Sequence, residues 1–149
     1  MRRMTLGIKA GAGKMTILAI LALGGGCSHF DQEWNAAANR PETGVEGRWQ
    51  GKWVSDVDGH SGELRCVLRR QGPNTYLASF HGTFWQVFSF SYDSPLHGYS
   101  NDGEFELAGR QDLCYPEGSV FYDGNVNNKR FFLTYRAKYD GGHFIMTRP

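Results

Sequence analysis

The sequence predicts an all-β domain, a single antiparallel meander of eight strands that closes into a barrel. After Gly47 the apolar residues recur with a period of two, and no stretch there has helical periodicity. The dipeptide Asp-Gly, typical of tight hairpin turns, occurs four times. All 21 aromatic residues follow residue 26 and can form a dense core. A barrel is favoured over a sandwich because closure removes the edge strands that such a chain would expose.

The first 26 residues have the pattern of an export signal. Four basic residues precede a short apolar run, Met15 to Leu23, and the segment has no acidic residue. The run is too short for a transmembrane helix, which needs roughly 20 apolar residues. The basic residues are Arg2, Arg3, Lys9 and Lys14. We therefore expect an exported protein without a permanent transmembrane anchor.

The end of this segment, Gly24-Gly25-Gly26-Cys27, resembles the lipobox of bacterial lipoproteins. In that family the cysteine is lipidated and becomes the first mature residue, which implies lipid attachment at Cys27 and a membrane-anchored protein of the cell envelope. Gly24 departs from the pattern, since the family usually has leucine there. Small residues at Gly24 and Gly26 suit ordinary cleavage equally, which would give a periplasmic or secreted soluble protein.

Residues 27–46 are expected to form a tether with a short helix. Asp31 is a candidate cap for a helix through Trp34 to Ala38, and Arg40-Pro41 should end it. Two arrangements remain open for this segment. It is either a flexible spacer, or Phe30 and Trp34 dock on the domain or on the membrane surface.

The barrel domain is assigned to residues 47–149. Its first three strands are expected around Trp49 to Trp53, Leu64 to Leu68 and Tyr76 to Phe80, where apolar and polar residues alternate. The turns between them are expected at Asp58-Gly59 and at Gly72-Pro73-Asn74.

Five more strands follow in the same pattern. Asp102-Gly103 and Asp140-Gly141 separate strands, whereas at Asp123-Gly124 the chain either turns or continues to Asn127-Asn128. The strands are expected around Phe88 to Tyr92, Phe105 to Leu107, Val120 to Tyr122, Phe131 to Ala137 and Phe144 to Met146.

Two features of this region resemble the calycins, the group of lipocalins, avidins and fatty-acid-binding proteins. Gly47-Arg48-Trp49 opens the first strand like the lipocalin Gly-x-Trp, and Arg148 stands in the last strand. The resemblance implies that Arg148 lies against Trp49 and that the other end of the barrel is open to a ligand. The second tryptophan, Trp53, departs from the pattern.

A barrel interior of this composition predicts a site for a small amphipathic or apolar molecule. The same rings could instead fill the interior completely. The candidate lining residues are Trp49, Trp53, Phe80, Phe90, Phe105 and Tyr135, and Trp85 of a rim loop is a further candidate for ligand binding.

The loops at one end should form an acidic rim with no Lys or Arg, suited to a cationic or hydroxyl-rich ligand. Asp is also a common turn residue, and turn chemistry alone would place several of these acids there. The rim acids are Asp56, Asp58, Asp112, Glu117 and Asp140, with His60, Trp85, Tyr115 and Tyr139 between them.

Two cysteines remain once Cys27 is assigned to attachment. Cys66 and Cys114 either pair as a disulfide in an oxidising envelope or stay as one buried and one partly exposed thiol. Cys66 is expected to point inward in a strand and Cys114 to belong to a rim loop, a geometry that is unfavourable for a disulfide.

The remaining patterns narrow the classes of function. Without the signal the chain has 12 Lys and Arg against 15 Asp and Glu, a formal charge of −3, which argues against nucleic acid. The histidines are scattered, so no metal is predicted, and no motif indicates a cofactor.

These patterns predict a non-enzymatic envelope lipoprotein that binds a small ligand. The alternative is a lipid-anchored module that contacts an envelope protein or a polysaccharide. A small hydrolase is the third hypothesis, and it requires converging carboxylates or histidines in one cleft.

Overall fold

The structure is a computed structural model that describes residues 26–102, 104–112 and 118–149, with side chains from residue 29 onward. The export signal predicted for residues 1–26 falls almost entirely outside this part, as do Tyr115, Glu117 and Cys114. The side chain of Cys27 is likewise outside it.

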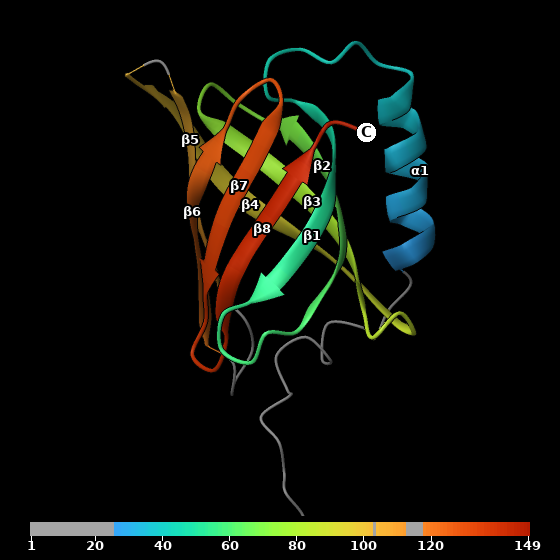
Figure 1. Ribbon diagram of the computed structural model, residues 1–149. Coiled ribbons are helices and arrows are strands. Elements are labelled where there is room, and N and C mark those ends of the chain that lie inside the picture. Colours follow the sequence, from blue (N-terminus) through green and yellow to red (C-terminus); the bar gives the residue numbers. More distant parts are fainter. Residues whose placement is uncertain (1–25, 103, 113–117) are drawn as a thin grey trace, which may run out of the picture.

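Eight antiparallel strands form one closed barrel, as predicted (Figure 1). Each strand pairs with the next, and the last pairs with the first. The strands are β1 (Gly47–Ser55), β2 (Ser61–Arg70), β3 (Thr75–Phe84), β4 (Phe88–Asn101), β5 (Glu104–Asp112), β6 (Ser119–Val126), β7 (Arg130–Arg136) and β8 (Gly141–Thr147).

Alternating burial explains why these segments are strands. In β7, Phe131, Leu133 and Tyr135 are buried and face inward, while Phe132 and Thr134 between them are half-buried. The inward residues of all eight strands join in a single apolar core inside the barrel. Aromatic residues thus form much of this core, as predicted.

The ambiguous Asp123-Gly124 lies inside β6 and is not a turn. Gly124 pairs with Leu133 of β7, and a Cβ at Gly124 would collide with the carbonyl oxygen of Phe132. Glycine is needed here because the two backbones approach closely. The chain turns instead at Asn127, whose side chain accepts hydrogen bonds from the amides of Lys129 and Arg130 at 2.9 and 2.8 Å.

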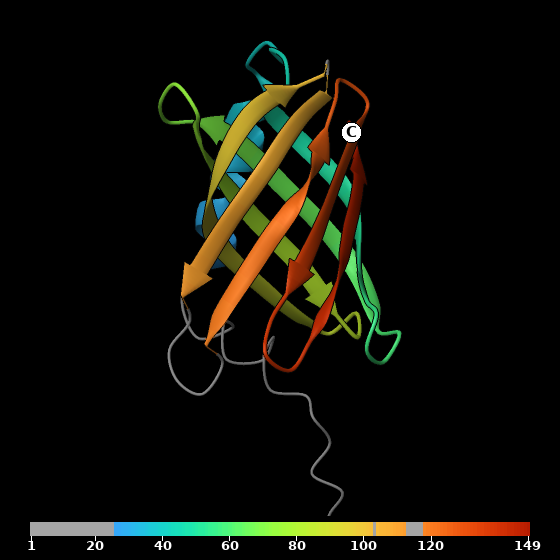
Figure 2. The same ribbon diagram turned by 90° about the vertical axis from the view of Figure 1, so that its left-hand side faces the viewer.

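The helix α1 (Gly26–Ala38) lies along the outside of the barrel, as the two views show (Figures 1 and 2). Phe30 and Ala37 are buried with Val67, an apolar residue on the outer face of β2. Of the two arrangements considered for residues 27–46, the structure therefore shows docking on the domain.

Charged contacts support the docked helix. Arg65 lies over the rings of Phe30 and Trp34, at 5.3 Å from each ring centre, and pairs with Asp31 at 3.3 Å. The predicted helix start at Asp31 is wrong, because α1 begins at Gly26 and Asp31 lies within it. Within the described residues, no helix combines the length and the apolarity needed to cross a bilayer.

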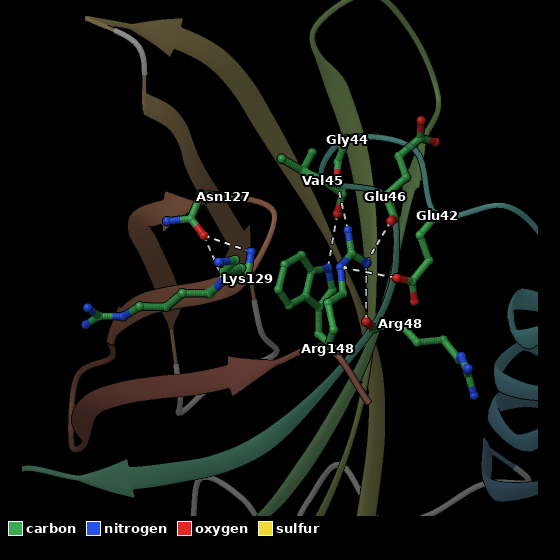
Figure 3. A network of polar contacts seen from close by, with 10 residues as sticks. Glu42, Gly44, Val45, Glu46, Arg48, Asn127, Lys129 and Arg148 are labelled. Carbon is green, nitrogen blue, oxygen red and sulfur yellow. Dashed lines mark hydrogen bonds and ion pairs between the residues drawn. The ribbon is translucent and has the colours of Figure 1, made fainter.

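One end of the barrel is closed by Arg148, which lies directly after β8 (Figure 3). We call it the Trp49 end, because β1 begins there. The guanidinium lies 3.9 Å from the centre of a Trp49 ring and donates hydrogen bonds to the carbonyls of Gly44 and Glu46, both at 2.8 Å. The Trp49 indole donates to the Val45 carbonyl at 3.0 Å. The contact between Arg148 and Trp49 implied by the calycin resemblance is present.

Candidate ligand-binding site

The opposite end, where β1 ends, is called the Ser55 end. The strand register places three residues with hydroxyl groups at one level of the inner wall. Tyr122 is paired with Tyr135, Tyr135 with Gly142, and Gly142 with Ser55. A Cβ at Gly142 would collide with the carbonyl of Val54, so this position requires glycine. Ser55, Tyr122 and Tyr135 thus form a row across β1, β8, β7 and β6.

Asp140 connects two of these hydroxyls from the turn between β7 and β8. Ser55 donates a hydrogen bond to one carboxylate oxygen at 2.7 Å, and Tyr135 donates to the other at 3.1 Å. The backbone amide of Gly141 donates a third bond at 2.8 Å. Burial, and then the negative charge of Asp140, raise the pKa of Tyr135 well above its ordinary value. Tyr135 therefore stays protonated and acts as a hydrogen-bond donor.

A second pair of hydroxyls joins this row from β4. The Tyr92 hydroxyl hydrogen-bonds that of Tyr122, and Ser94 lies beside Tyr122. Burial raises the pKa of both tyrosines, so both hydroxyls remain neutral at physiological pH. We call Ser55, Tyr92, Ser94, Tyr122 and Tyr135 the hydroxyl cluster. Tyr92 is only half-buried although its side chain points inward.

Aromatic rings form the floor of the hydroxyl cluster. The ring centre of Phe144 lies 5.1 Å from that of Tyr135 and 6.4 Å from that of Tyr122. Phe80 lies 5.3 Å from both Phe144 and Tyr92. The cluster thus places polar groups beside apolar rings within the core of the barrel. A small molecule bound there would hydrogen-bond through its polar end and bury its apolar part, as in most small-molecule sites.

The seven predicted ligand-binding residues do not gather at one site. Tyr135 belongs to the hydroxyl cluster and Phe80 to its floor. The ring centre of Trp53 lies 6.4 Å from that of Phe90. Trp49 lies at the opposite end, against Phe131 at 5.6 Å and under Arg148.

Two other predicted ligand-binding residues also lie away from the hydroxyl cluster. The ring centre of Phe105 lies 5.5 Å from that of Tyr76, near the start of β5 at the Trp49 end. Trp85 is half exposed in the turn between β3 and β4, in a rim loop as expected. Sequence periodicity places a residue on the inner face of a strand, but it cannot show its level in the barrel.

The described acids of the rim predicted for the Ser55 end have partners close by. Asp58 lies 2.8 Å from His60, and Asp56 lies 3.1 Å from His143. A hydrogen bond from the His60 backbone is the main cause of the lowered pKa of Asp58. The expectation that no Lys or Arg lies there is wrong, because the turn between β7 and β8 begins at Ala137 and includes Lys138.

Asp112 at the end of β5 is also paired, since Arg110 lies 2.9 Å from its carboxylate. The hydrogen bond from Ser119, and then that from Arg110, lower the pKa of Asp112. Most of the described rim acids therefore serve local pairing and turn geometry, which was the simpler of the two interpretations.

Cys66 faces the interior as a free, buried thiol, and burial raises its pKa well above the ordinary value. It lies in the register between Trp49 and Phe80. Its predicted partner Cys114 falls outside the described residues. In the part of the chain that is described, no three His, Cys, Asp or Glu side chains gather closely enough to hold a metal ion.

Two hollows outside the barrel are weaker candidates for a ligand site. One of about 790 Å³ lies between Lys52, Glu63, Thr83 and Trp85, but it is wide open to solvent and excludes little water. The other, under Phe30 of α1, measures about 120 Å³. That is smaller than the roughly 300 Å³ of a typical ligand site.

Sequence reasoning did not predict the hydroxyl cluster. Tyr92 and Tyr122 were expected in strands, and Asp140 in the rim, but their meeting depends on which strands pair and in what register. The available signal was Ser94, a polar residue on the same inward face of β4 as Phe90 and Tyr92. A small hydroxyl in that position indicates a polar partner inside the barrel.

Comparison of the chain with protein families, with curated proteins and with solved structures found no match. What the protein does is therefore inferred from the barrel and the hydroxyl cluster themselves.

Proposed function

We propose that the protein is a non-enzymatic, lipid-anchored envelope protein whose barrel binds a small amphipathic molecule. The hydroxyl cluster above its aromatic floor carries this proposal. Tyr122 and Tyr135 stay protonated, and because Tyr135 donates its proton to Asp140, its oxygen is left to accept from a polar group. The Asp140 carboxylate adds an acceptor at the same place, which favours a ligand whose polar end carries a hydroxyl or an amine.

The geometry favours binding over hydrolysis. Ser55 is hydrogen-bonded to the Asp140 carboxylate, but a serine nucleophile also needs a neighbouring base, usually histidine. His143 is paired with Asp56 and its ring lies against Phe132, an outward residue of β7. Tyrosines with raised pKa values are poor bases at neutral pH.

A fluorescent probe tests the binding proposal. N-phenyl-1-naphthylamine combines apolar rings with one amine, and we expect its fluorescence to rise on binding to the full chain. Tyr122→Phe combined with Tyr135→Phe should weaken binding about fivefold, since the single amine of the probe donates one hydrogen bond of about 1 kcal/mol and about 1.4 kcal/mol is a factor of ten.

The matched control for the probe is Tyr99→Phe, which removes a hydroxyl from an exposed tyrosine on the outside of β4. Its affinity for the probe should equal that of the unchanged protein. Equal affinities for the control and the double variant, or no binding by the unchanged protein, would contradict the proposal.

A second candidate function is an interaction module at the Ser55 end. Several large apolar side chains are exposed on its turns, among them Trp85, Val87 and Phe88. Exposed apolar groups that gather in one place commonly mark a contact surface. This observation does not compete with ligand binding inside the barrel, because these side chains lie outside it.

A further inference from the structure

The exposed apolar side chains of the barrel are concentrated at one end. Seven large apolar residues are exposed in the described part of the chain, and five of them lie on turns of the Ser55 end or directly beside one. The other two, Tyr99 and Phe121, lie on strands. The five are Val57, Trp85, Val87, Phe88 and Tyr139.

The turns at the Trp49 end have a different composition. Residues 71–74 are Gln-Gly-Pro-Asn, residues 102–103 are Asp-Gly, and residues 127–129 are Asn-Asn-Lys. None of these positions carries a large apolar side chain. Because both ends of the barrel need only short connections, turn formation alone does not account for the apolar residues at the Ser55 end.

Trp85, Val87 and Phe88 form what we call the apolar tip, in the hairpin between β3 and β4. Their side chains are 51%, 80% and 60% exposed. Trp85 and Gln86 both adopt positive φ angles, 51° and 59°, a conformation that hairpins usually give to Asn-Gly. The Trp85 ring is held in place by Phe84, at 4.7 Å, and by His60, at 6.1 Å. The turn thus displays Trp85 in a conformation that tryptophan seldom adopts.

The chain enters the described structure close to this tip. Phe30, in the second turn of α1, stacks on His81 at 5.1 Å, and His81 is paired with Ser91. Three residue pairs further along the same hairpin, Phe84 is paired with Phe88 at the tip. The helix α1 begins at the Ser55 end, and Cys27, the predicted residue of lipid attachment, is its second residue (Figure 1).

The charged groups near the tip disfavour an anionic partner. Asp58 lies beside His60 and Asp56 beside His143, while Lys138 lies 4.9 Å from the Tyr139 ring centre. Among these groups two carboxylates stand against one lysine. Tryptophan and tyrosine rings suit the interfacial layer of a bilayer, where one edge is apolar and the other is wet.

We propose that the apolar tip, together with Tyr139, inserts into the interfacial layer of a lipid bilayer and holds the Ser55 end against the membrane. This contact rests on the proposed lipid anchor at Cys27, which lies in the first turn of α1 and brings the Ser55 end to the membrane surface. It does not require a ligand in the barrel.

Quenching of tryptophan fluorescence by brominated lipid tests the contact. The protein with its lipid anchor at Cys27 is reconstituted into phosphatidylcholine vesicles whose acyl chains carry bromine near the headgroup. The difference in fluorescence between this protein and its Trp85→Phe variant gives the emission of Trp85 apart from that of Trp34, Trp49 and Trp53. We expect the Trp85 emission to be lost on brominated vesicles and kept on unbrominated ones.

The matched control moves the indole to the other end of the barrel. Trp85→Phe combined with Tyr99→Trp places it at a position that is 47% exposed, close to the 51% of Trp85. Emission from the new indole should be unaffected by the brominated lipid. Val87→Ser combined with Phe88→Ser should reduce quenching of Trp85 without changing the circular dichroism of the barrel.

Three outcomes would overturn the membrane contact. Trp85 could be left unquenched while the chain is bound to the vesicles, which would mean that the N-terminal segment alone makes the contact. The indole at position 99 could be quenched equally, which would mean that the barrel has no fixed orientation. Association of two copies through the tip in the absence of lipid, abolished by the Val87 and Phe88 substitutions, would assign the surface to self-association instead.

Discussion

Arg148 joins segments that lie far apart in the chain. Its guanidinium donates to the carbonyls of Gly44 and Glu46 and covers Trp49, at distances of 2.8, 2.8 and 3.9 Å. A planar group with several donors suits this geometry, because each carbonyl lies in a different direction while the flat face stacks on the indole. One side chain thus satisfies backbone groups of the loop before β1 and closes the Trp49 end (Figure 3).

Arg148→Met is expected to lower the free energy of unfolding by about 2 kcal/mol, from the lost hydrogen bonds and the lost cation–π contact. Arg148→Lys should recover less than half of this loss, because an ammonium group cannot reach all the carbonyls and stacks less well. Urea denaturation followed by circular dichroism measures the difference.

The matched control for Arg148 is Arg130→Met. Arg130 also lies over an aromatic ring, that of Phe132 at 5.4 Å, but on the outside of the barrel. Its loss should change stability little, since surface substitutions usually do. Equal losses for the two variants would show that the carbonyl contacts of Arg148 contribute nothing.

Among the elements, α1 is the one whose position the sequence left open. The signal for its docking was Val67, an apolar residue at an outward position of a strand whose other outward residues are charged. Val67 is buried only because Phe30 and Ala37 cover it. Periodicity could suggest the helix, but not which face of the barrel receives it, because that depends on contacts between segments.

The docking of α1 is expected to weaken as the pH falls. Burial beneath Phe30, and then the charge of Arg65, lower the pKa of His81 from its ordinary value of 6.5, while Asp31 opposes this shift. The docked state therefore favours neutral His81. Its stability is complete above about pH 6.5 and is lost as the pH falls through the lowered pKa, because the undocked state binds the proton more tightly.

Hydrogen exchange of the α1 amides between about pH 5.5 and about pH 7.5, corrected for the intrinsic rate, measures this docking. Protection should decrease toward the acidic side in the unchanged protein. His81→Gln keeps a hydrogen-bonding group opposite Ser91 but cannot be protonated, so its protection should not depend on pH. The same pH dependence in that variant would assign the effect to another group, such as the pair of His29 and Glu33.

At the scale of the whole molecule, the two ends of the barrel differ in composition and in role. The Trp49 end has polar turns and is closed by Arg148. The Ser55 end combines the hydroxyl cluster inside with the apolar tip outside. If both proposals hold, the ligand and the membrane meet at the same end, so an amphipathic molecule could pass between bilayer and barrel without crossing bulk water.

Attachment itself is tested by mass spectrometry of the protein extracted from membranes with detergent. We expect a chain that begins at Cys27 and carries acyl groups, and we expect Cys27→Ser to remain unmodified. An unmodified Cys27 in a chain cleaved after Gly26 would instead indicate a simply secreted protein, and would remove the anchored part of the proposed function.

The fold was predictable because its signals are local. Two-residue periodicity located all eight strands, and Asp-Gly or Gly-Pro-Asn marked most turns. The hydroxyl cluster was not predictable from the sequence, because Ser55, Tyr122 and Tyr135 meet only through pairings between β6, β7, β8 and β1. The position of Trp85 in a rim turn was expected, whereas its positive φ angle was not, because tryptophan seldom adopts that conformation.

Closure between β1 and β8 has a consequence for how the chain folds. Gln50 is paired with Thr147, so this seam joins residues separated by almost the whole domain. Contacts of such long range form slowly, since the intervening chain must first be ordered. Until β8 arrives, β1 and β7 are unpaired edges beside an aromatic interior, a state prone to aggregation. During synthesis the domain therefore depends on its last strand, and a chaperone that shields the partly formed sheet should matter more for its yield than for its final stability.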